Sequence, residues 1–226
     1  MVGRDVNETF TVEQDLQRPY TTRQLEILGA ATQVFSEHGY RAGTIAQIAS
    51  VAGLSQAGLL HHFPNKDAML MAVIELRRQE NLDLFRAEVG SGQMVVDAVL
   101  SVLRTNARQP ELVRLFAVLS TEALNPDHPA HRFFLGFYAL QLAEIADSTV
   151  INQAAGLVRD DIDADEIARL ITAAADGARY QSLLDNGVIE HWRTLLPLRK
   201  MLAGAACGPL PDWAPEEEGQ RLIHMS

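Results

Sequence analysis

The chain of 226 residues is poor in cysteine, in proline and in long apolar runs. Cys207 is the single cysteine, which excludes an intramolecular disulfide and fits a reduced compartment better than secretion. No stretch reaches the roughly 18 consecutive apolar residues of a membrane-spanning helix, and the first residues contain no apolar core of a signal peptide. We therefore expect a soluble, cytoplasmic protein that does not contact a membrane.

Catalytic motifs are also missing from the sequence. There is no glycine-rich phosphate loop, no Gly-x-Ser-x-Gly turn and no paired-cysteine motif. No residues remain on which a catalytic mechanism would rest. We expect the protein not to be an enzyme and to need no cofactor.

Two clusters have a partial resemblance to metal sites. The alternating aspartates of residues 161–165 open like a calcium loop, but Glu166 stands where glycine is needed and Thr172 where the bidentate glutamate belongs. His128 and His131 have a spacing seen in zinc sites, yet Pro129 separates them and no third ligand is evident. We expect no bound metal.

Acidic residues outnumber basic ones, 29 to 19, for a net charge of −10. This balance argues against a protein whose whole surface binds nucleic acid. The acidity is unevenly distributed, since residues 18–78 carry six basic and four acidic side chains while residues 79–226 have a balance of −9. A mildly basic N-terminal part is therefore attached to an acidic remainder.

Apolar residues recur at three- and four-residue steps, which is the periodicity of amphipathic helices, and strands are hard to find. The fold class is therefore all-α, with about nine helices. We expect them over residues 21–38, 44–51, 55–62, 66–88, 92–108, 110–124, 129–155, 164–185 and 190–205. Pro197 lies inside the last range, so that helix is either kinked or begins near this residue.

Residues 44–70 contain the pattern of a helix-turn-helix. Ala49 supplies a small residue where two helices meet, Gly53 supplies the turn, and Ser55 caps the second helix. Apolar residues that would fix both helices on a third are Ile45, Ile48, Ala52, Leu54 and Leu59. A plain helical corner without DNA binding is the alternative, because packing and turn chemistry make no reference to DNA.

Over about residues 20–70 the chain resembles the Tet repressor (TetR) family of bacterial transcription regulators. The resemblance rests on Gly39-Tyr40, Ile48-Ala49, Ala52-Gly53-Leu54-Ser55, His62-Phe63 and Lys66-Asp67. It implies an N-terminal three-helix head and a larger helical domain that binds an effector and dimerises. Two positions depart from the family pattern: Leu60 replaces a tyrosine that commonly contacts phosphate, and Gly43 replaces a threonine.

The resemblance places a recognition helix at residues 55–62, whose first residues would face base edges in the major groove. Gln56 can pair with adenine, while Thr44, Lys66, Tyr40 and the neighbouring histidines are candidates for phosphate contact. The candidate DNA-binding residues are Tyr40, Thr44, Ser55, Gln56, Ala57, Gly58, Leu60, His61, His62 and Lys66. For His62, packing beside Phe63 is an equally good interpretation.

We divide the chain into a flexible tail at residues 1–17, a DNA-binding domain at 18–66, an effector-binding and dimerisation domain at 67–206, and a loose tail at 207–226. Aromatic residues cluster within the third part and would line an apolar pocket with a few polar groups. The candidate ligand-binding residues are Phe116, Leu119, Glu122, Phe134, Phe137, Tyr138, Gln141 and Tyr180. A plain aromatic core is the alternative for each of them.

A stripe of small and apolar residues, Leu170, Ile171, Ala174, Ala175 and Ala178, runs along the helix at 164–185. Together with Trp192, Leu195 and Leu196 it suits a two-fold interface of a homodimer through the helices near 164–185 and 190–205. Packing within one chain is the competing explanation.

These patterns predict a ligand-responsive repressor that binds a palindromic, double-stranded DNA operator as a homodimer. A small, partly apolar effector would release it. The alternative is a helical small-molecule-binding or protein-interaction module with weakened DNA binding, which Leu60 and the modest charge of the head favour.

Overall fold

Side-chain caps begin the first three helices that the structure describes, and the sequence predicts the one at Ser55. The computed structural model describes residues 20–128, 130–185 and 190–210. Thr21 and Thr44 cap α2 (Thr22–Ala42) and α3 (Ile45–Val51) through capping boxes, and Ser55 caps α4 (Gln56–His62). The predicted tail at 1–17, and residues 211–226 of the predicted tail at 207–226, lie outside the described residues.

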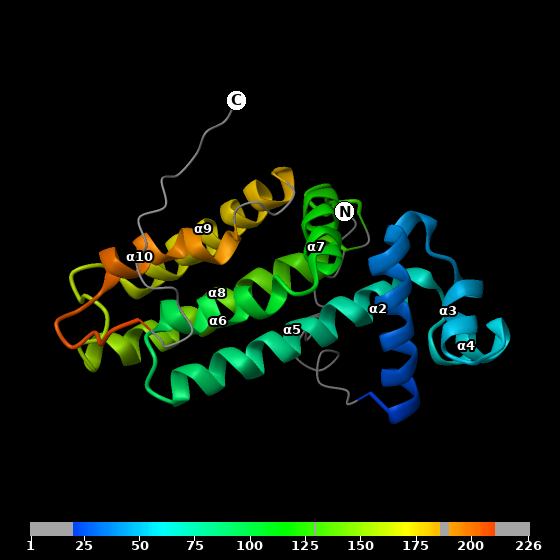
Figure 1. The fold of residues 1–226 in the computed structure, drawn as a ribbon, viewed down its shortest axis with the longest axis horizontal. Coiled ribbons are helices and arrows are strands. Elements are labelled where there is room, and N and C mark those ends of the chain that lie inside the picture. Colours follow the sequence, from blue (N-terminus) through cyan, green and yellow to red (C-terminus); the bar gives the residue numbers. More distant parts are fainter. Residues whose placement is uncertain (1–19, 129, 186–189, 211–226) are drawn as a thin grey trace, which may run out of the picture.

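Beyond α4 the chain continues as helices separated by short connections (Figure 1). They are α5 (Lys66–Gly90), α6 (Val95–Asn106), α7 (Pro110–Glu122), α8 (His131–Ala154), α9 (Ala164–Leu184), the 3-10 turn η1 (His191–Thr194) and α10 (Leu195–Leu202). Together with α2, α3 and α4 they make nine α-helices within the described residues. These residues contain no strand, apart from one isolated bridge between Val158 and Ala203. The all-α fold predicted from the periodicity is confirmed.

Glycine and proline act where the sequence placed them. Gly39 has a φ of +76° and interrupts α2 near its end, and Gly53 has a φ of +64° in the turn between α3 and α4. Pro197 is the third residue of α10, in the first turn, where a backbone N–H has no partner within the helix. Of the two alternatives for Pro197, the structure therefore supports a helix that begins close to it.

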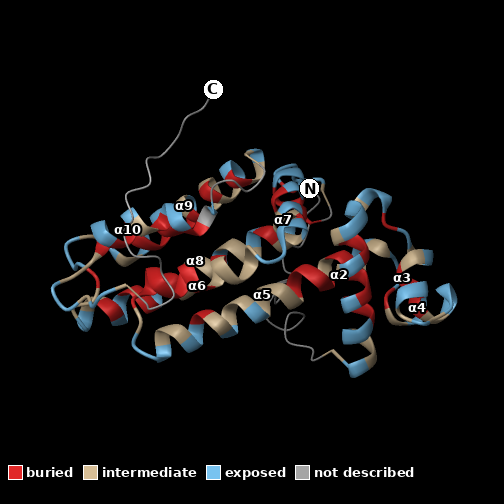
Figure 2. Ribbon diagram, viewed as in Figure 1, coloured by how far each residue is buried: buried red, intermediate tan, exposed pale blue. Residues whose placement is uncertain are grey.

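The interior consists of two apolar clusters joined along α5. The first cluster holds the head, packing Phe35, Ile48 and Leu59 with Leu70 of α5, and it extends to α7 and the start of α8. The second cluster lies between α6, α8, α9 and α10. Buried positions of α5 gather at its end next to α2 (Figure 2). The head therefore shares its core with helices that belong to the larger part of the chain.

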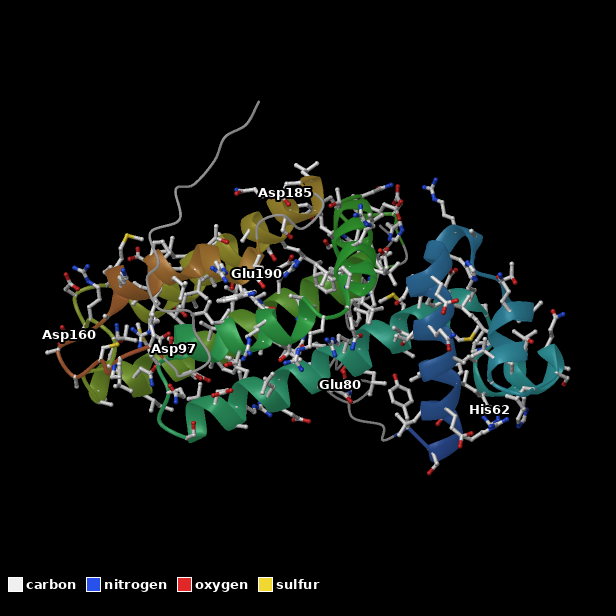
Figure 3. The ribbon with its side chains drawn as sticks, viewed as in Figure 1. His62, Glu80, Asp97, Asp160, Asp185 and Glu190 are labelled. Carbon is white, nitrogen blue, oxygen red and sulfur yellow. The ribbon has the colours of Figure 1, made fainter. Side chains whose placement is uncertain are left out.

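A buried ion pair fastens the C-terminal segment to α6. Arg199 Nε donates to Asp97 Oδ1 at 2.6 Å, with both side chains less than a tenth exposed, and Asp97 lies near the start of α6 (Figure 3). Arg199 Nη2 also donates to the carbonyls of Gly208 and Pro209, at 3.1 and 2.9 Å. This guanidinium thus holds residues 208–209 of the segment predicted to be loose.

By length and composition, α8 is apolar enough to cross a membrane, with a mean hydropathy of 1.2 over 18 residues. Its apolar run is not continuous, because Gln141 and Glu144 interrupt the segment. One such helix is weak evidence for a membrane span, and α8 packs against both α6 and α9. Only 28% of that stretch is buried in the chain, which leaves much of its apolar surface uncovered.

Candidate functional site

Helix α4 presents a short row of exposed residues at one end of the molecule, where Figure 3 labels His62. Leu59 is fully buried in the head, which fixes the rotation of the helix. Gln56 and Ala57 are exposed in its first turn, and within the described part of the chain the Gln56 side chain makes no hydrogen bond. The Ser55 hydroxyl accepts from the N–H of Gly58 at 3.1 Å. The side-chain amide of Gln56 is therefore exposed at a helix N-terminus that Ser55 caps.

The N-terminus of α3 provides a second polar element next to α4. The Thr44 hydroxyl accepts from the N–H of Gln47 at 3.2 Å and donates to Gln47 Oε1 at 2.8 Å. Thr44 is exposed, so its hydroxyl lies at the surface while it caps the helix. The partial positive charge of a helix N-terminus makes this position suitable for a phosphate.

Lys66 and Tyr40 have partners inside the chain. Lys66 Nζ donates to the carbonyls of Tyr40 and Gly43 at 2.9 and 3.1 Å, and it lies 4.4 Å from the centre of the Tyr40 ring. The Tyr40 hydroxyl donates to Asp67. Burial, and then the bond to Asp67, raise the pKa of Tyr40 above its ordinary value. Both residues therefore fix the end of α2 against the start of α5.

The last turn of α4 combines an apolar residue with two imidazoles. Leu60 is 38% exposed, so an apolar side chain occupies the position where the family pattern has a hydroxyl. The rings of His61 and His62 pack edge to face, with 5.7 Å between the ring centres. His61 is exposed and His62 is half-buried, which leaves His61 the more accessible of the two.

Arginines of the head are engaged by neighbouring groups. Arg23 pairs with Glu26 and donates to the carbonyl of Ala52 at 3.1 Å, which ties α2 to the turn after α3. Arg41 pairs with Glu122 of α7 at 3.3 Å, although its side chain is 92% exposed. Glu122 therefore faces the head.

A cavity of about 220 Å³ lies among α5, α6, α7, α8 and α9. Its apolar lining includes Phe85, Leu103, Phe116, Phe137 and Ile145. Polar side chains that line it are Arg77, Arg78, Asn81, Arg86, Asn106, Gln109, Gln141, Glu144, Thr172 and Arg179. Such a mixture of apolar walls and a few polar groups is typical of small-molecule sites.

Three of the predicted ligand-binding residues, Phe116, Phe137 and Gln141, line this cavity. The structure places Leu119, Glu122, Phe134, Tyr138 and Tyr180 outside its lining. Leu119 and Phe134 are buried in the first apolar cluster.

The two tyrosines outside the lining bond to neighbouring helices. The Tyr180 hydroxyl lies 2.7 Å from Thr121 Oγ1, and the Tyr138 hydroxyl donates to Asp176 Oδ2 at 2.9 Å. Burial, and then the negative charge of Asp176, raise the pKa of Tyr138 above its ordinary value. Both hydroxyls are occupied by contacts that link helices.

Sequence reasoning missed the arginines of the cavity and three of its amides, Asn81, Asn106 and Gln109. On α5 they follow Ile74 at helical steps, as Arg77, Arg78 and Asn81, and Phe85 continues the same face. A polar interruption of an apolar stripe is a signal that the sequence offers.

The polar clusters considered for metals form other contacts. His131 Nδ1 lies 2.8 Å from the carbonyl of Ala123, and the N–H of Ala130 donates to His128 Nδ1 at 3.2 Å. Arg159 pairs with Asp161 at 2.5 Å. Over residues 20–128, 130–185 and 190–210, no group of three or more His, Cys, Asp or Glu side chains is placed to hold a metal.

Comparison with known proteins gives a consistent group of similarities. The family described as "Bacterial regulatory proteins, tetR family" matches residues 27–73. The transcriptional regulator RutR of Escherichia coli K12 is 29% identical over 108 residues, and the transcriptional repressor AcnR of Corynebacterium jeikeium is 25% identical over 160 residues. The crystal structure of a TetR transcription regulator from Haloarcula marismortui superposes with a TM-score of 0.69 at 20% identity.

The extent of these matches differs. The RutR match spans 45% of this chain and about half, 49%, of that relative, whereas the AcnR match spans 69% of this chain and 78% of that relative. The Haloarcula structure covers 81% of this chain and is itself covered completely. Similarity therefore extends from the head into the larger helical part.

Proposed function

Because the chain belongs to the tetR family of bacterial regulatory proteins, we propose that it is a cytoplasmic, sequence-specific DNA-binding transcriptional repressor. It binds a palindromic operator as a homodimer and is released by a small, partly apolar effector. The observation that carries the proposal is the capped helix α4, which exposes Gln56 and Ala57 while Leu59 anchors it in the head. The similar curated proteins are named as regulators and repressors, not as enzymes.

In this proposal the first turn of α4 enters the major groove. An exposed glutamine there can form two hydrogen bonds with the N6 and N7 atoms of adenine. The N-terminus of α3, with the exposed Thr44, binds a nearby phosphate of the DNA backbone. This contact fixes the register of the head on the duplex. Lys66 is engaged with carbonyls of α2 and supplies positive potential rather than a free ammonium group.

The operator can be found by selection from random DNA duplexes, and the role of Gln56 is then tested with Gln56→Ala. We expect a relaxed preference at one base pair per half-site, which costs about 1–3 kcal/mol of discrimination. Gln33→Ala is the matched control, since Gln33 is exposed on α2 and bonds to Glu37. An unchanged base preference in Gln56→Ala would contradict direct readout by this residue.

One observation favours the alternative of a ligand-binding module with weakened DNA binding. Leu60 exposes an apolar side chain on α4 and cannot donate a hydrogen bond to a phosphate. The same selection decides between the two functions. Enrichment of a palindrome supports the repressor, and the absence of any enriched sequence supports the module.

The homodimer requires an interface, and the structure changes which residues are available for it. Ile171, Ala175, Ala178, Trp192 and Leu195 of the predicted interface are buried within one chain. For these five residues the competing explanation, packing within the chain, accounts for the stripe. Leu170 remains exposed, at 46%.

Exposed apolar and small residues instead lie along α8 and α9, which pack side by side. On α8 they are Leu135, Ala139, Ala143, Val150 and Ile151, and on α9 they are Leu170, Ala173 and Leu184. We therefore assign the dimer interface to α8 and α9, where small residues let the helices of two chains approach closely. A two-fold axis there gives the protein the two heads that a palindromic operator needs.

A further inference from the structure

The polar atoms without partners are concentrated in the cavity. In the described part of the chain, four buried side-chain atoms lack a hydrogen-bond partner: Arg77 Nη2, Asn106 Oδ1, Thr172 Oγ1 and Arg179 Nη1. All four belong to residues that line the cavity. Buried polar groups are nearly always paired because an unpaired one destabilises the fold. Their concentration at one site indicates that a bound molecule pairs with them.

Most of the arginine charge at the cavity is already paired. Arg78 donates twice to Glu75, at 2.7 and 2.8 Å, and Arg86 donates to Glu144 at 2.5 and 3.0 Å. Both guanidinium groups therefore face a carboxylate of the chain itself. They leave little positive charge for a ligand.

Arg77 differs from these arginines. Its Nη1 donates to Glu80 at 3.0 Å, and Glu80 is half-exposed near the middle of α5, where Figure 3 labels it. Its Nη2 is buried and has no acceptor within the described residues. A guanidinium group has donors only, so the atom that satisfies Nη2 must be an acceptor, and the strongest acceptors are anionic oxygens.

Arg179 provides a second guanidinium near the aromatic wall. Its Nη1 lies 2.9 Å from Asp176 Oδ1 as an ion pair, but the direction of the contact is not that of a hydrogen bond. The group lies 4.8 Å from the centre of the Phe116 ring. Its charge is thus compensated by Asp176, and Arg77 remains the principal anchor for an anion.

Helix register brings an amide close to Arg77. Helices α5 and α6 are joined by the short segment 91–94 and run antiparallel, so Arg77 comes opposite Asn106, at the end of α6. The Asn106 amide presents either its oxygen or, after a half-turn, its NH₂ donor at the same position. Arg77 and Asn106 therefore both contribute polar side chains to the cavity, from adjacent helices.

The remaining lining limits the rest of the ligand. Phe85, Val99, Leu103, Ile145 and Ile171 give the cavity an apolar wall. An apolar cavity of about 150 Å³ holds benzene. The 220 Å³ present here then accommodates a ligand of roughly nine to twelve non-hydrogen atoms.

We propose that the effector is a monocarboxylate with a compact apolar body of this size, bound through Arg77 and Asn106 with its body against the apolar wall. The N–H groups of a guanidinium match the oxygens of a carboxylate, and the single unpaired amino group of Arg77, Nη2, matches a single negative charge. The identification of the molecule as an effector rests on the proposed function. The binding of the carboxylate itself does not depend on it.

The test uses calorimetry on the full chain with three eight-carbon probes: octanoate, octan-1-ol and octyl phosphate. We expect octanoate to bind more tightly than both the neutral alcohol and the phosphate. In Arg77→Gln the dissociation constant for octanoate should rise by about 10- to 100-fold, because a hydrogen bond to a charged group is lost. Arg77→Lys keeps the charge but loses the planar guanidinium, so its dissociation constant for octanoate should lie between those of the wild type and Arg77→Gln. It replaces Arg77→Gln if that variant does not fold.

Arg114→Gln is the matched control, since Arg114 is half-exposed on α7 and does not line the cavity. It should bind octanoate like the wild type. Equal binding of octan-1-ol, tighter binding of octyl phosphate, or no binding of octanoate would overturn the proposal. If an operator is selected but octanoate does not bind, the proposed carboxylate ligand is refuted and the proposed repressor function stands. Octanoate binding without any enriched DNA sequence keeps the ligand and refutes the repressor.

Discussion

At the scale of single residues, long-range partners decide what a side chain does. Lys66 shows this, since the resemblance makes it a phosphate contact while its Nζ is bonded to carbonyls of Tyr40 and Gly43, more than twenty positions earlier. The carbonyls at a helix C-terminus carry a partial negative charge that attracts an ammonium group. No local pattern in the sequence reports a contact over such a separation.

Tyr138 should make the free energy of unfolding decrease as the pH rises into the alkaline range. Its folded-state pKa lies above the unfolded value of about 10, so its stabilising contribution is complete below that pH and is lost as the pH rises further. In Tyr138→Phe the free energy of unfolding should fall by about 1 kcal/mol at pH 7, through loss of the bond to Asp176. It should also decline less steeply than in the wild type between about pH 10 and 11.5.

Urea denaturation at a series of pH values measures this difference. Tyr20 and Tyr40 also have raised pKa values, chiefly through burial, so the alkaline decline should be reduced and not abolished. Parallel declines in the variant and the wild type would show that the Tyr138 phenol does not couple to folding.

The sequence reveals only part of the candidate site, for a physical reason. Gln56 and Ser55 follow from local rules, because a cap and the first turn of a helix are fixed by neighbouring residues. Among the aromatic residues, periodicity does not separate Phe137, which lines the cavity, from Phe134, which is buried in the first cluster. That distinction depends on which helices pack against α8.

At the scale of helices, the sequence is much more informative. Caps, glycines and prolines act within a few residues, so most predicted ranges agree with the structure to within a few positions. Thr44 and Ser55 precede α3 and α4, and Pro110 begins α7. The last range differs most, since α10 begins at Leu195 and not at residue 190, after the 3-10 turn η1. Helix α6 begins at Val95 and not at residue 92, because Gly92 adopts a φ of +88° in the preceding turn.

The turn between α3 and α4 depends on Gly53, whose φ is +64°. Gly53→Ala should lower the free energy of unfolding by about 1–2 kcal/mol, because a side chain disfavours the left-handed conformation. Gly29→Ala is the control, since Gly29 lies within α2 and a Cβ there meets nothing within 4 Å. It should stabilise the protein by up to about 1 kcal/mol. Equal effects of both variants, measured in urea, would show that the turn is not under this constraint.

At the scale of the whole molecule, the proposed dimer interface is the exposed side of α8 and α9. The apolar character of α8 is visible in the sequence. How much of this helix is buried by the rest of its own chain is known only from the packing, and only 28% of its apolar stretch is buried. The sequence predicts the interface along the helices near 164–185 and 190–205. Helix α10 buries Leu195, Leu198 and Leu202 within its own chain.

Ala143→Arg places a charge in the middle of the exposed stripe of α8. An unpaired charge in a buried interface is costly, so we expect the dimer dissociation constant to rise by at least about 100-fold. Ala87→Arg, on the exposed side of α5, is the matched control and should remain dimeric. Sedimentation equilibrium distinguishes the two, and a dimeric Ala143→Arg variant would place the interface elsewhere.

Helix α5 contributes Leu70 and Val73 to the core of the head and Leu82 and Phe85 to the wall of the cavity. With 25 residues it is about 37 Å long. In a repressor built on this shared helix, occupancy of the cavity and occupancy of the operator act on the same element. Thermodynamic linkage then requires the operator to weaken effector binding by the same factor by which the effector weakens operator binding. The affinity of the cavity measured on free protein will therefore exceed its affinity on the protein that is bound to DNA.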